Sequence, residues 1–258
     1  MISEGLAALT AGSTWTLDRE IPLTFDAHHA QGMAFDGERY WVSSVDKTRA
    51  RGVVFVLSSS FELLETIEVG DSTCFHPGGI DIAAGFVWLP SATYDVSGPT
   101  LVQRISIADG GLETIFSVDH HLGALCPMAD STIFSVDWGS RTLLLWSAEG
   151  ELLAKKANPS HFVDWQDLQA VGEDLVACGG LARVQRSPAS DLLWIGGLAL
   201  VSTTTLEILS EVPFPGYSVS GLPATAEGFV LAEGASGLEL TALPDGGFGP
   251  VSVWRQTG

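Results

Sequence analysis

The chain has 258 residues, of which 46% are hydrophobic and only 17% are charged, so it is long enough to bury a large core. Its 31 acidic residues outnumber the 12 basic ones, and the net charge of −19 repels nucleic-acid phosphates and anionic membrane surfaces. We therefore expect neither nucleic acid nor membrane as a partner.

The N-terminal segment and the cysteines indicate where the protein works. Residues 1–15 include an early Glu4 and lack the basic start and apolar core of a signal peptide. No apolar run approaches the ~18–20 residues that a membrane-spanning helix needs. Cys74, Cys126 and Cys178 are odd in number and form no CxxC pair, which is typical of reduced, buried thiols. These features predict a cytoplasmic protein.

Short apolar runs separated by Gly, Asp, Ser and Pro dominate the chain, and helical periodicity is scarce. The clearest runs span residues 39–45, 52–58, 63–69, 86–92, 101–107, 132–138, 142–148 and 229–234. Turn sequences such as FDGER and IADGG lie between neighbouring runs. This pattern predicts many antiparallel strands joined by hairpins.

An internal repeat defines the architecture. Each unit consists of a leader, an apolar strand, a tight turn and a second apolar strand, and the units start at His29, His76, His121, Asp164 and Ser218. Their starts lie 47, 45, 43 and 54 residues apart, a period that suits one four-stranded propeller blade. We therefore predict an all-β protein in which residues 1–258 form a single β-propeller of five four-stranded blades.

The two ends of the chain are expected to close the ring. Residues 14–25 precede the first leader and are predicted to complete the last blade, which reduces exposed sheet edges. Whether residues 249–256 add another strand to that blade stays open. Six blades are the alternative if residues 180–215 form a sheet of their own.

All six histidines lie in the leaders, where the chain enters the strands that line the channel of a propeller. Equivalent leader positions carry His29, His76, His121 and Asp164, which we predict to converge at the channel mouth. Imidazole nitrogens completed by a carboxylate are a typical ligand set for divalent transition metals. These four residues are therefore predicted to hold Zn, Mn, Fe, Ni or Cu, with positions left open for substrate.

Other polar residues near the leaders are candidates for catalysis. Asp164 is also a candidate base, and His28, His120 and His161 are candidate catalytic residues. Substrate contacts or partners of the ligands are expected among Gln31, Asp81, Gln166, Asp167 and Gln169, and entrance residues among Asp46, Tyr94, Asp137 and Trp138. The predicted function is metal-dependent hydrolysis, or lyase or isomerase chemistry, on a small carbonyl or carboxylate substrate.

Three alternatives stay open at this point. The histidines and Asp164 could form an acid–base pocket without metal, or a purely structural ring. The propeller could also be a non-catalytic scaffold that docks a protein or peptide on one face. Such a scaffold predicts no stoichiometric metal and a docking patch outside the channel.

The segment HPGGIDIAAGFVWLPS, residues 76–91, resembles the blades of the lactonase-like propellers, a group that includes gluconolactonases, strictosidine synthase-like proteins and NHL propellers. The resemblance covers most of the chain as blades and implies a fold rather than a reaction. In the gluconolactonase branch it implies a divalent ion held by carboxylate and asparagine oxygens. The leaders here carry histidines and one aspartate instead, and the sequence looks most like a bacterial propeller family to which we assign no activity.

Overall fold

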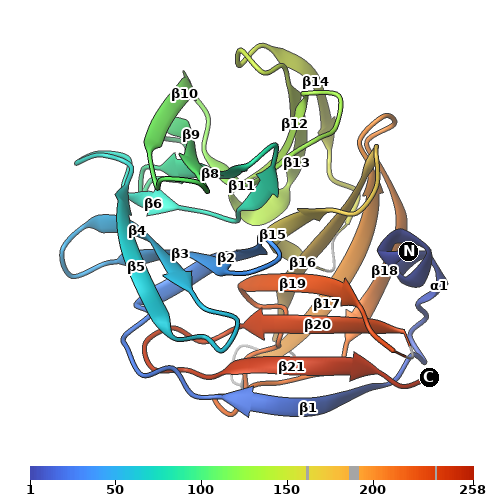
Figure 1. The fold of residues 1–258 in the computed structure, drawn as a ribbon. Coiled ribbons are helices and arrows are strands. Elements are labelled where there is room, and N and C mark those ends of the chain that lie inside the picture. Colours follow the sequence, from blue (N-terminus) through green and yellow to red (C-terminus); the bar gives the residue numbers. More distant parts are fainter. Residues whose placement is uncertain (161–162, 186–191, 236) are drawn as a thin grey trace.

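Five antiparallel sheets surround a central axis in the computed structural model, which describes residues 1–160, 163–185, 192–235 and 237–258 (Figure 1). Each sheet runs from an inner strand at the axis to an outer strand at the rim. This arrangement is a five-bladed β-propeller with four strands in each blade, as the repeat predicts.

The first two blades follow the chain from inside to outside, and the inner strand of the second blade is divided in two. The first blade contains β2 (His29–Phe35), β3 (Tyr40–Asp46), β4 (Arg51–Leu57) and β5 (Leu63–Val69). The second contains β6 (His76–Pro77), β7 (Asp81–Ala83), β8 (Phe86–Ala92), β9 (Thr100–Ser106) and β10 (Leu112–Val118).

The third and fourth blades have the same order, and two short helices lie outside the sheets. The third blade contains β11 (Leu122–Pro127), β12 (Ile133–Asp137), β13 (Thr142–Trp146) and β14 (Leu152–Ala157). The fourth contains β15 (Asp164–Ala170), β16 (Leu175–Gln185), β17 (Leu192–Ser202) and β18 (Glu207–Phe214). The helices are α1 (Ile2–Ala8) and the 3₁₀ turn η1 (Trp138–Ser140).

The fifth blade joins the two ends of the chain. It contains β19 (Gly228–Glu233), β20 (Leu238–Leu243), β21 (Val251–Gln256) and, on the outside, the N-terminal strand β1 (Trp15–Ile21). β1 pairs with β21 from Trp15 opposite Gln256 to Ile21 opposite Val251. The prediction that the N-terminal strand closes the ring is confirmed, and residues 249–256 do contribute a strand.

The structure rules out the six-blade alternative and corrects one detail of the predicted repeat. Residues 180–185 and 192–215 belong to the fourth blade, with β16, β17 and β18, and form no sheet of their own. The fifth inner strand does not follow Ser218 closely, since the main-chain N–H of Ser218 bonds to the carbonyl of Leu222 in a tight turn. The inner strand is β19, which begins ten residues later at Gly228.

The hydrophobic core consists of five clusters, one between each pair of neighbouring blades. Trp41 of β3, for example, packs with Ile80 and Leu89 of the next blade. Because both faces of a blade are covered by its neighbours, strands such as β4 are apolar along nearly their whole length. Cys74, Cys126 and Cys178 are buried free thiols, as expected.

The inner strands approach one another so closely that glycine is required at the axis. A Cβ at Gly79 would lie 2.6 Å from the carbonyl oxygen of Gln166, and one at Gly32 would lie 2.7 Å from the Cα of Gly79. The carboxylate of Asp167 fills the centre, where it accepts main-chain N–H groups of Met33, Ile80, Phe229 and Leu168. Asp167 is fully buried and joins three blades to its own. It is therefore a structural residue rather than the substrate contact that the sequence predicts.

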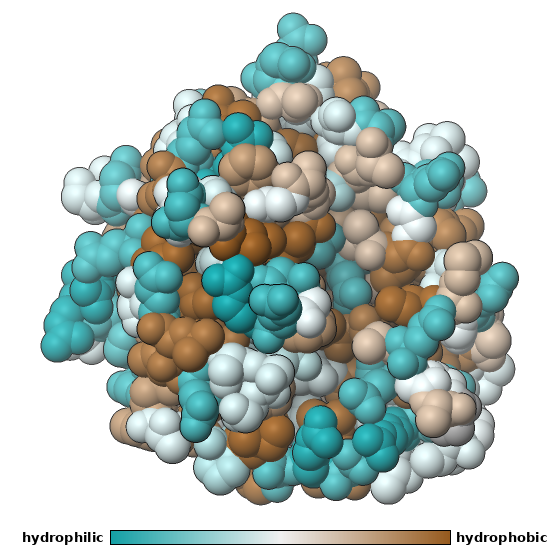
Figure 2. Space-filling model, in the orientation of Figure 1, coloured by the Kyte–Doolittle hydropathy of each residue, from teal (hydrophilic) through white to brown (hydrophobic). Residues whose placement is uncertain are grey.

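The outer surface carries few large apolar areas on the face seen in Figure 2. Hydrophilic side chains lie between separate hydrophobic groups there, and no single apolar patch extends across the blades (Figure 2). Within the described part of the chain, no helix has the length and apolar character needed to cross a membrane.

Candidate functional site

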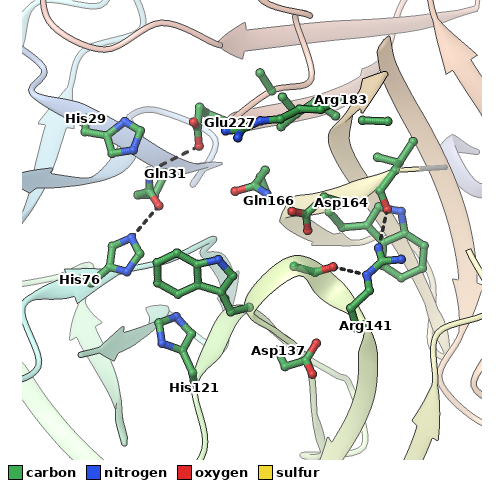
Figure 3. Close-up of a pocket in the computed structure, with 18 of the residues that line it drawn as sticks. His29, Gln31, His76, His121, Asp137, Arg141, Asp164, Gln166, Arg183 and Glu227 are labelled. Atoms are coloured by element: carbon green, nitrogen blue, oxygen red, sulfur yellow. Dashed lines mark hydrogen bonds between the residues drawn. The ribbon is translucent and has the colours of Figure 1, made fainter. Parts of the chain in front are cut away.

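A cavity of about 870 Å³ lies where the five inner strands begin. Every blade contributes a polar side chain to its wall (Figure 3). They are His29 and Gln31 of β2, His76 of β6, His121 before β11, Asp164 and Gln166 of β15, and Glu227 before β19. The four predicted metal-ligand residues therefore line one cavity, and their role as ligands stays a prediction.

Gln31 connects His76 with Glu227 through its side-chain amide. Its Oε1 lies 3.0 Å from Nε2 of His76, while its Nε2 donates to the carbonyl of Ala30 at 2.9 Å and to Glu227 at 3.4 Å (Figure 3). Because an amide oxygen only accepts, the His76 proton lies on Nε2. Nδ1 of His76 is buried and has no hydrogen-bond partner among the described residues.

The three cavity histidines are neutral at neutral pH. Burial lowers the pKa of His76 to about 3, helped by His121, His29 and Lys47. Burial, and then the positive charge of Lys47, lowers the pKa of His29 to about 4. Burial also lowers the pKa of His121, although the hydrogen bond to Asp95 opposes this. Each ring therefore keeps one unprotonated nitrogen that can accept a proton or bind a metal.

A hydrogen bond and an aromatic contact fix the ring of His121, whereas the ring of His29 makes no hydrogen bond within the described residues. Nδ1 of His121 lies 2.8 Å from the carbonyl oxygen of Asp95, so that nitrogen carries the hydrogen and Nε2 is unprotonated. The His121 ring also meets the edge of Trp138 at 4.6 Å. The His29 ring makes no hydrogen bond within the described residues, so both of its nitrogens are available to a bound molecule.

The pKa values of the cavity carboxyl groups are shifted in the opposite direction from those of the cavity histidines. Burial raises the pKa of Glu227 well above its ordinary value, Lys47 opposes this, and Asp167 and Asp164 raise it further. Burial also raises the pKa of Asp164, against the positive charge of Arg141. The raised pKa favours the protonated form of Glu227 beside neutral imidazoles, a pairing that can supply a proton donor and a proton acceptor to one cavity.

Two predicted catalytic histidines, His28 and His120, are not brought to the cavity wall. The rings of His28 and His120 lie outside it, and His28 instead approaches Asp26 and Asp46 at 3.5 and 3.9 Å. Each directly precedes a cavity histidine but lies outside the strands, and the backbone of His28 is in the left-handed region at φ 53°. His161 lies outside the described residues.

The other residues predicted as substrate contacts or entrance residues divide into those that line the cavity and those that do not. Gln31, Gln166, Tyr94, Asp137 and Trp138 line the cavity, as expected for contact or entrance residues.

Asp46, Asp81 and Gln169 do not line the cavity. Asp46 pairs with Arg49. Asp81 accepts hydrogen bonds from the Ala170 N–H and the Cys126 thiol, and burial raises its pKa to about 6. Gln169 bonds to the main chain of β19. These three side chains have structural partners.

Sequence reasoning missed several cavity residues, of which Glu227 is the most important. Glu227–Gly228–Phe229 has the same form as Gln31–Gly32–Met33, a long polar residue and a glycine before an apolar strand. Aligning the repeats on that glycine would have found it. Lys47, Arg141, Arg183 and Trp194 also line the wall, but they lie outside the leaders, and only the folded chain brings them there.

Comparison with known proteins adds a family. Residues 3–248 match the model of a family of unknown function, DUF6454. The chain belongs to this family. A search of curated proteins finds no match.

Solved structures similar to this member of the family are propellers with different activities. A bifunctional GH43-CE protein of Bacteroides eggerthii has a TM-score of 0.62 at 10% identity, over 93% of this chain and 34% of that one. A gluconolactonase of Xanthomonas campestris has a TM-score of 0.51 at 14% identity, over 98% of this chain and 92% of that one. A streptogramin B lyase has a TM-score of 0.51 at 10% identity, over 97% of this chain and 100% of that one. At such identities the likeness shows the fold alone.

Proposed function

We propose that this protein is an enzyme that acts on a small organic molecule in the channel-mouth cavity, with His29 as general base and Glu227 as general acid. The observation that carries the proposal is that all five blades contribute polar side chains to one cavity of about 870 Å³. A structural ring would satisfy these groups within the protein, as happens for Asp167, because buried polar groups that serve packing are normally satisfied. Here Nδ1 of His76 and Oδ1 of Asp164 have no hydrogen-bond partner among the described residues.

The protonation states support these two roles. A general base needs an unprotonated nitrogen, and the lowered pKa of His29 keeps its ring neutral above about pH 4. A general acid needs a proton at neutral pH, and the raised pKa of Glu227 favours the protonated form of its carboxyl. His29 would take a proton from the substrate or from water, and Glu227 would give one to the leaving oxygen. This pair suits elimination by a lyase or hydrolysis of an ester or lactone.

A metal-dependent form of this chemistry is the second candidate, and the hydrogen bonds of two histidines favour it. Metal-binding histidines commonly donate their other ring N–H to a carbonyl or carboxylate oxygen. His121 lies against the Asp95 carbonyl and His76 against the Gln31 amide oxygen in this way. A divalent transition metal there would polarise a substrate carbonyl. Among the residues that the structure describes, no three His, Cys, Asp or Glu side chains are grouped to hold an ion as they stand.

The test of the acid–base proposal is turnover by matched variants. A panel of lactones, aryl esters and β-substituted carboxylic acids would be screened by mass spectrometry of the products. For a converted compound, His29→Gln and Glu227→Gln are expected to lower kcat by about 100-fold or more, the range for losing one general acid or base. His28→Gln is the matched control, because its ring lies next in sequence but outside the cavity, and it should keep wild-type kcat.

Two results would contradict the proposal. One is wild-type kcat in folded His29→Gln and Glu227→Gln. The other is the absence of turnover across the panel together with a protein or peptide that binds a face of the propeller, which would favour the scaffold.

The metal form has its own measurement. Elemental analysis of untagged protein purified without chelator is expected to show about one transition-metal ion per chain, lost in His76→Ala. A folded His76→Ala protein that retains its metal would rule out this ligand set.

A further inference from the structure

The cations of this acidic protein are distributed unevenly. Seven described lysines and arginines form ion pairs with carboxylates, namely Arg19, Arg39, Arg49, Arg51, Arg104, Lys156 and Arg255. The four described cations that form none are Lys47, Arg141, Lys155 and Arg183, and three of these line the cavity. Asp137, Asp164 and Glu227 line the same cavity, so cations and carboxyl groups are equal in number there, whereas the whole chain has a net charge of −19.

Two of these cations are free to meet a ligand. Arg141 is already held by the carbonyl oxygens of Ser160 and Val163. Lys47 and Arg183 make no hydrogen bond or ion pair within the described chain, and each lies against an aromatic ring. The ammonium of Lys47 is 5.7 Å from the Tyr94 ring centre, and the guanidinium of Arg183 is 4.6 Å from that of Trp194.

Aromatic side chains form the cavity wall beside Lys47. Tyr94 stacks on His76 at 4.4 Å, with ring planes 24° apart, and Trp138 lies 5.4 Å from the same ring. Despite these contacts, Tyr94 stays 42% exposed and Trp138 38% exposed. An exposed aromatic surface fixed from behind offers a flat face to a sugar ring or a planar ring of a ligand.

On the basis of the proposed function, we propose that the substrate is a ring-bearing carboxylate. Its carboxylate lies at Lys47, with Arg183 adding positive charge, and its ring packs against Tyr94 and Trp138. Burial raises the pKa of Glu227 and of Asp164, which favours their uncharged forms and reduces their repulsion of the anion. An organic cation would also favour aromatic faces, but the ammonium of Lys47 at this wall repels it.

Isothermal titration with matched acid and amide probes tests this inference. The pairs are benzoate with benzamide and glucuronate with glucuronamide, which present the same ring with and without a charge. In at least one pair the acid is expected to bind about ten-fold more tightly than the amide, the effect of one favourable charge contact. Lys47→Met is expected to reduce that preference to about two-fold, and Arg183→Met to weaken it less. Methionine keeps most of the apolar stem at both positions.

Lys155→Met on β14 is the matched control, because Lys155 also lacks an ion pair but lies outside the cavity. It removes the same net charge and should leave the acid preference intact. Equal binding of acid and amide, loss of the preference in Lys155→Met, or no binding by any of the four probes would overturn the inference.

Failure of this inference is separable from failure of the proposed function. The inference concerns affinity in the Lys47 variant, whereas the proposed function concerns kcat in His29→Gln and Glu227→Gln. A neutral substrate turned over by a His29- and Glu227-dependent reaction would contradict only the inference.

Discussion

Polar groups are buried in two neighbouring parts of the propeller axis, but their hydrogen bonding differs. At the closed centre, the Asp167 carboxyl group accepts four main-chain N–H groups from four blades. At the cavity above it, Nδ1 of His76 and Oδ1 of Asp164 have no hydrogen-bond partner in the described residues.

This difference separates the polar residues that stabilise the fold from those that can bind a ligand. A buried polar group whose hydrogen bonds are all made within the protein stabilises the fold and has nothing left to offer a ligand. A polar group that the protein leaves unsatisfied reduces stability, and such groups gather at sites that a ligand completes. The following four predictions test this contrast, first at the centre and then at the cavity.

Removing the central carboxylate is expected to have the largest effect. Asp167→Ala leaves three or four buried N–H groups without an acceptor, which should lower the free energy of unfolding by about 3–5 kcal/mol. Urea denaturation followed by tryptophan fluorescence measures the loss. Asp130→Ala, which removes an exposed turn carboxylate bonded to Thr132, should lose about 1 kcal/mol or less. Equal losses in the two variants would contradict the central role of Asp167.

The second-largest loss of stability is expected from a substitution that fills the space between inner strands. The added Cβ of Gly79→Ala would meet the Gln166 carbonyl at 2.6 Å and the Ala124 side chain at 2.7 Å, so the strands must move apart. We expect a loss of about 1–3 kcal/mol in the same denaturation experiment. Gly12→Ala is the control, because its nearest neighbour would be 3.6 Å away. A Gly79→Ala protein as stable as Gly12→Ala would show that the axis is not closely packed.

Acid sensitivity tests the buried imidazole of His76. Its pKa is about 3 in the folded protein against 6.5 as the ordinary value, so the unfolded chain binds more protons between these limits. The stability linked to His76 is therefore complete above pH 6.5 and is lost as the pH falls towards 3. His76→Gln should lose less free energy of unfolding than wild type between pH 7 and pH 4.

The pH dependence is judged by comparing His76→Gln with wild type in the same urea denaturation series from pH 7 to pH 4. A His76→Gln curve that runs parallel to the wild-type curve would show that the His76 ring is not held neutral by the fold.

The smallest effect on stability is expected at Glu227. Because its folded pKa is raised, the stability linked to it is present below the ordinary value of 4.5 and is lost as the pH rises towards the folded pKa. Glu227→Gln should change stability by about 1 kcal/mol or less at pH 5. From pH 5 to pH 9 its melting temperature should fall less than that of wild type. An identical fall in both proteins would contradict a raised pKa of Glu227 in the folded protein.

Much of the fold could be predicted because each blade repeats one local pattern. Apolar runs and turns specified the strands, and the spacing of the leaders from His29 to Asp164 specified blades of four strands. The leftover N-terminal segment correctly predicted closure through β1 and β21. The fifth unit was misplaced at Ser218, because the turn there resembles a leader and the true leader residue is an acid rather than a histidine.

The amino-acid sequence by itself determined the class of fold, the closing strand and the side chains that the leaders carry to the channel mouth, since these depend on local periodicity. Only the tertiary structure decided that His28 and His120 lie outside the cavity, that Asp167 closes the axis, and that Glu227, Lys47 and Arg183 join the cavity wall. Which side a residue faces depends on strand register and bulges, and which distant residues meet depends on the closed ring. Burial then determined the pKa values of His29 and Glu227, because desolvation exists only once the blades have packed together.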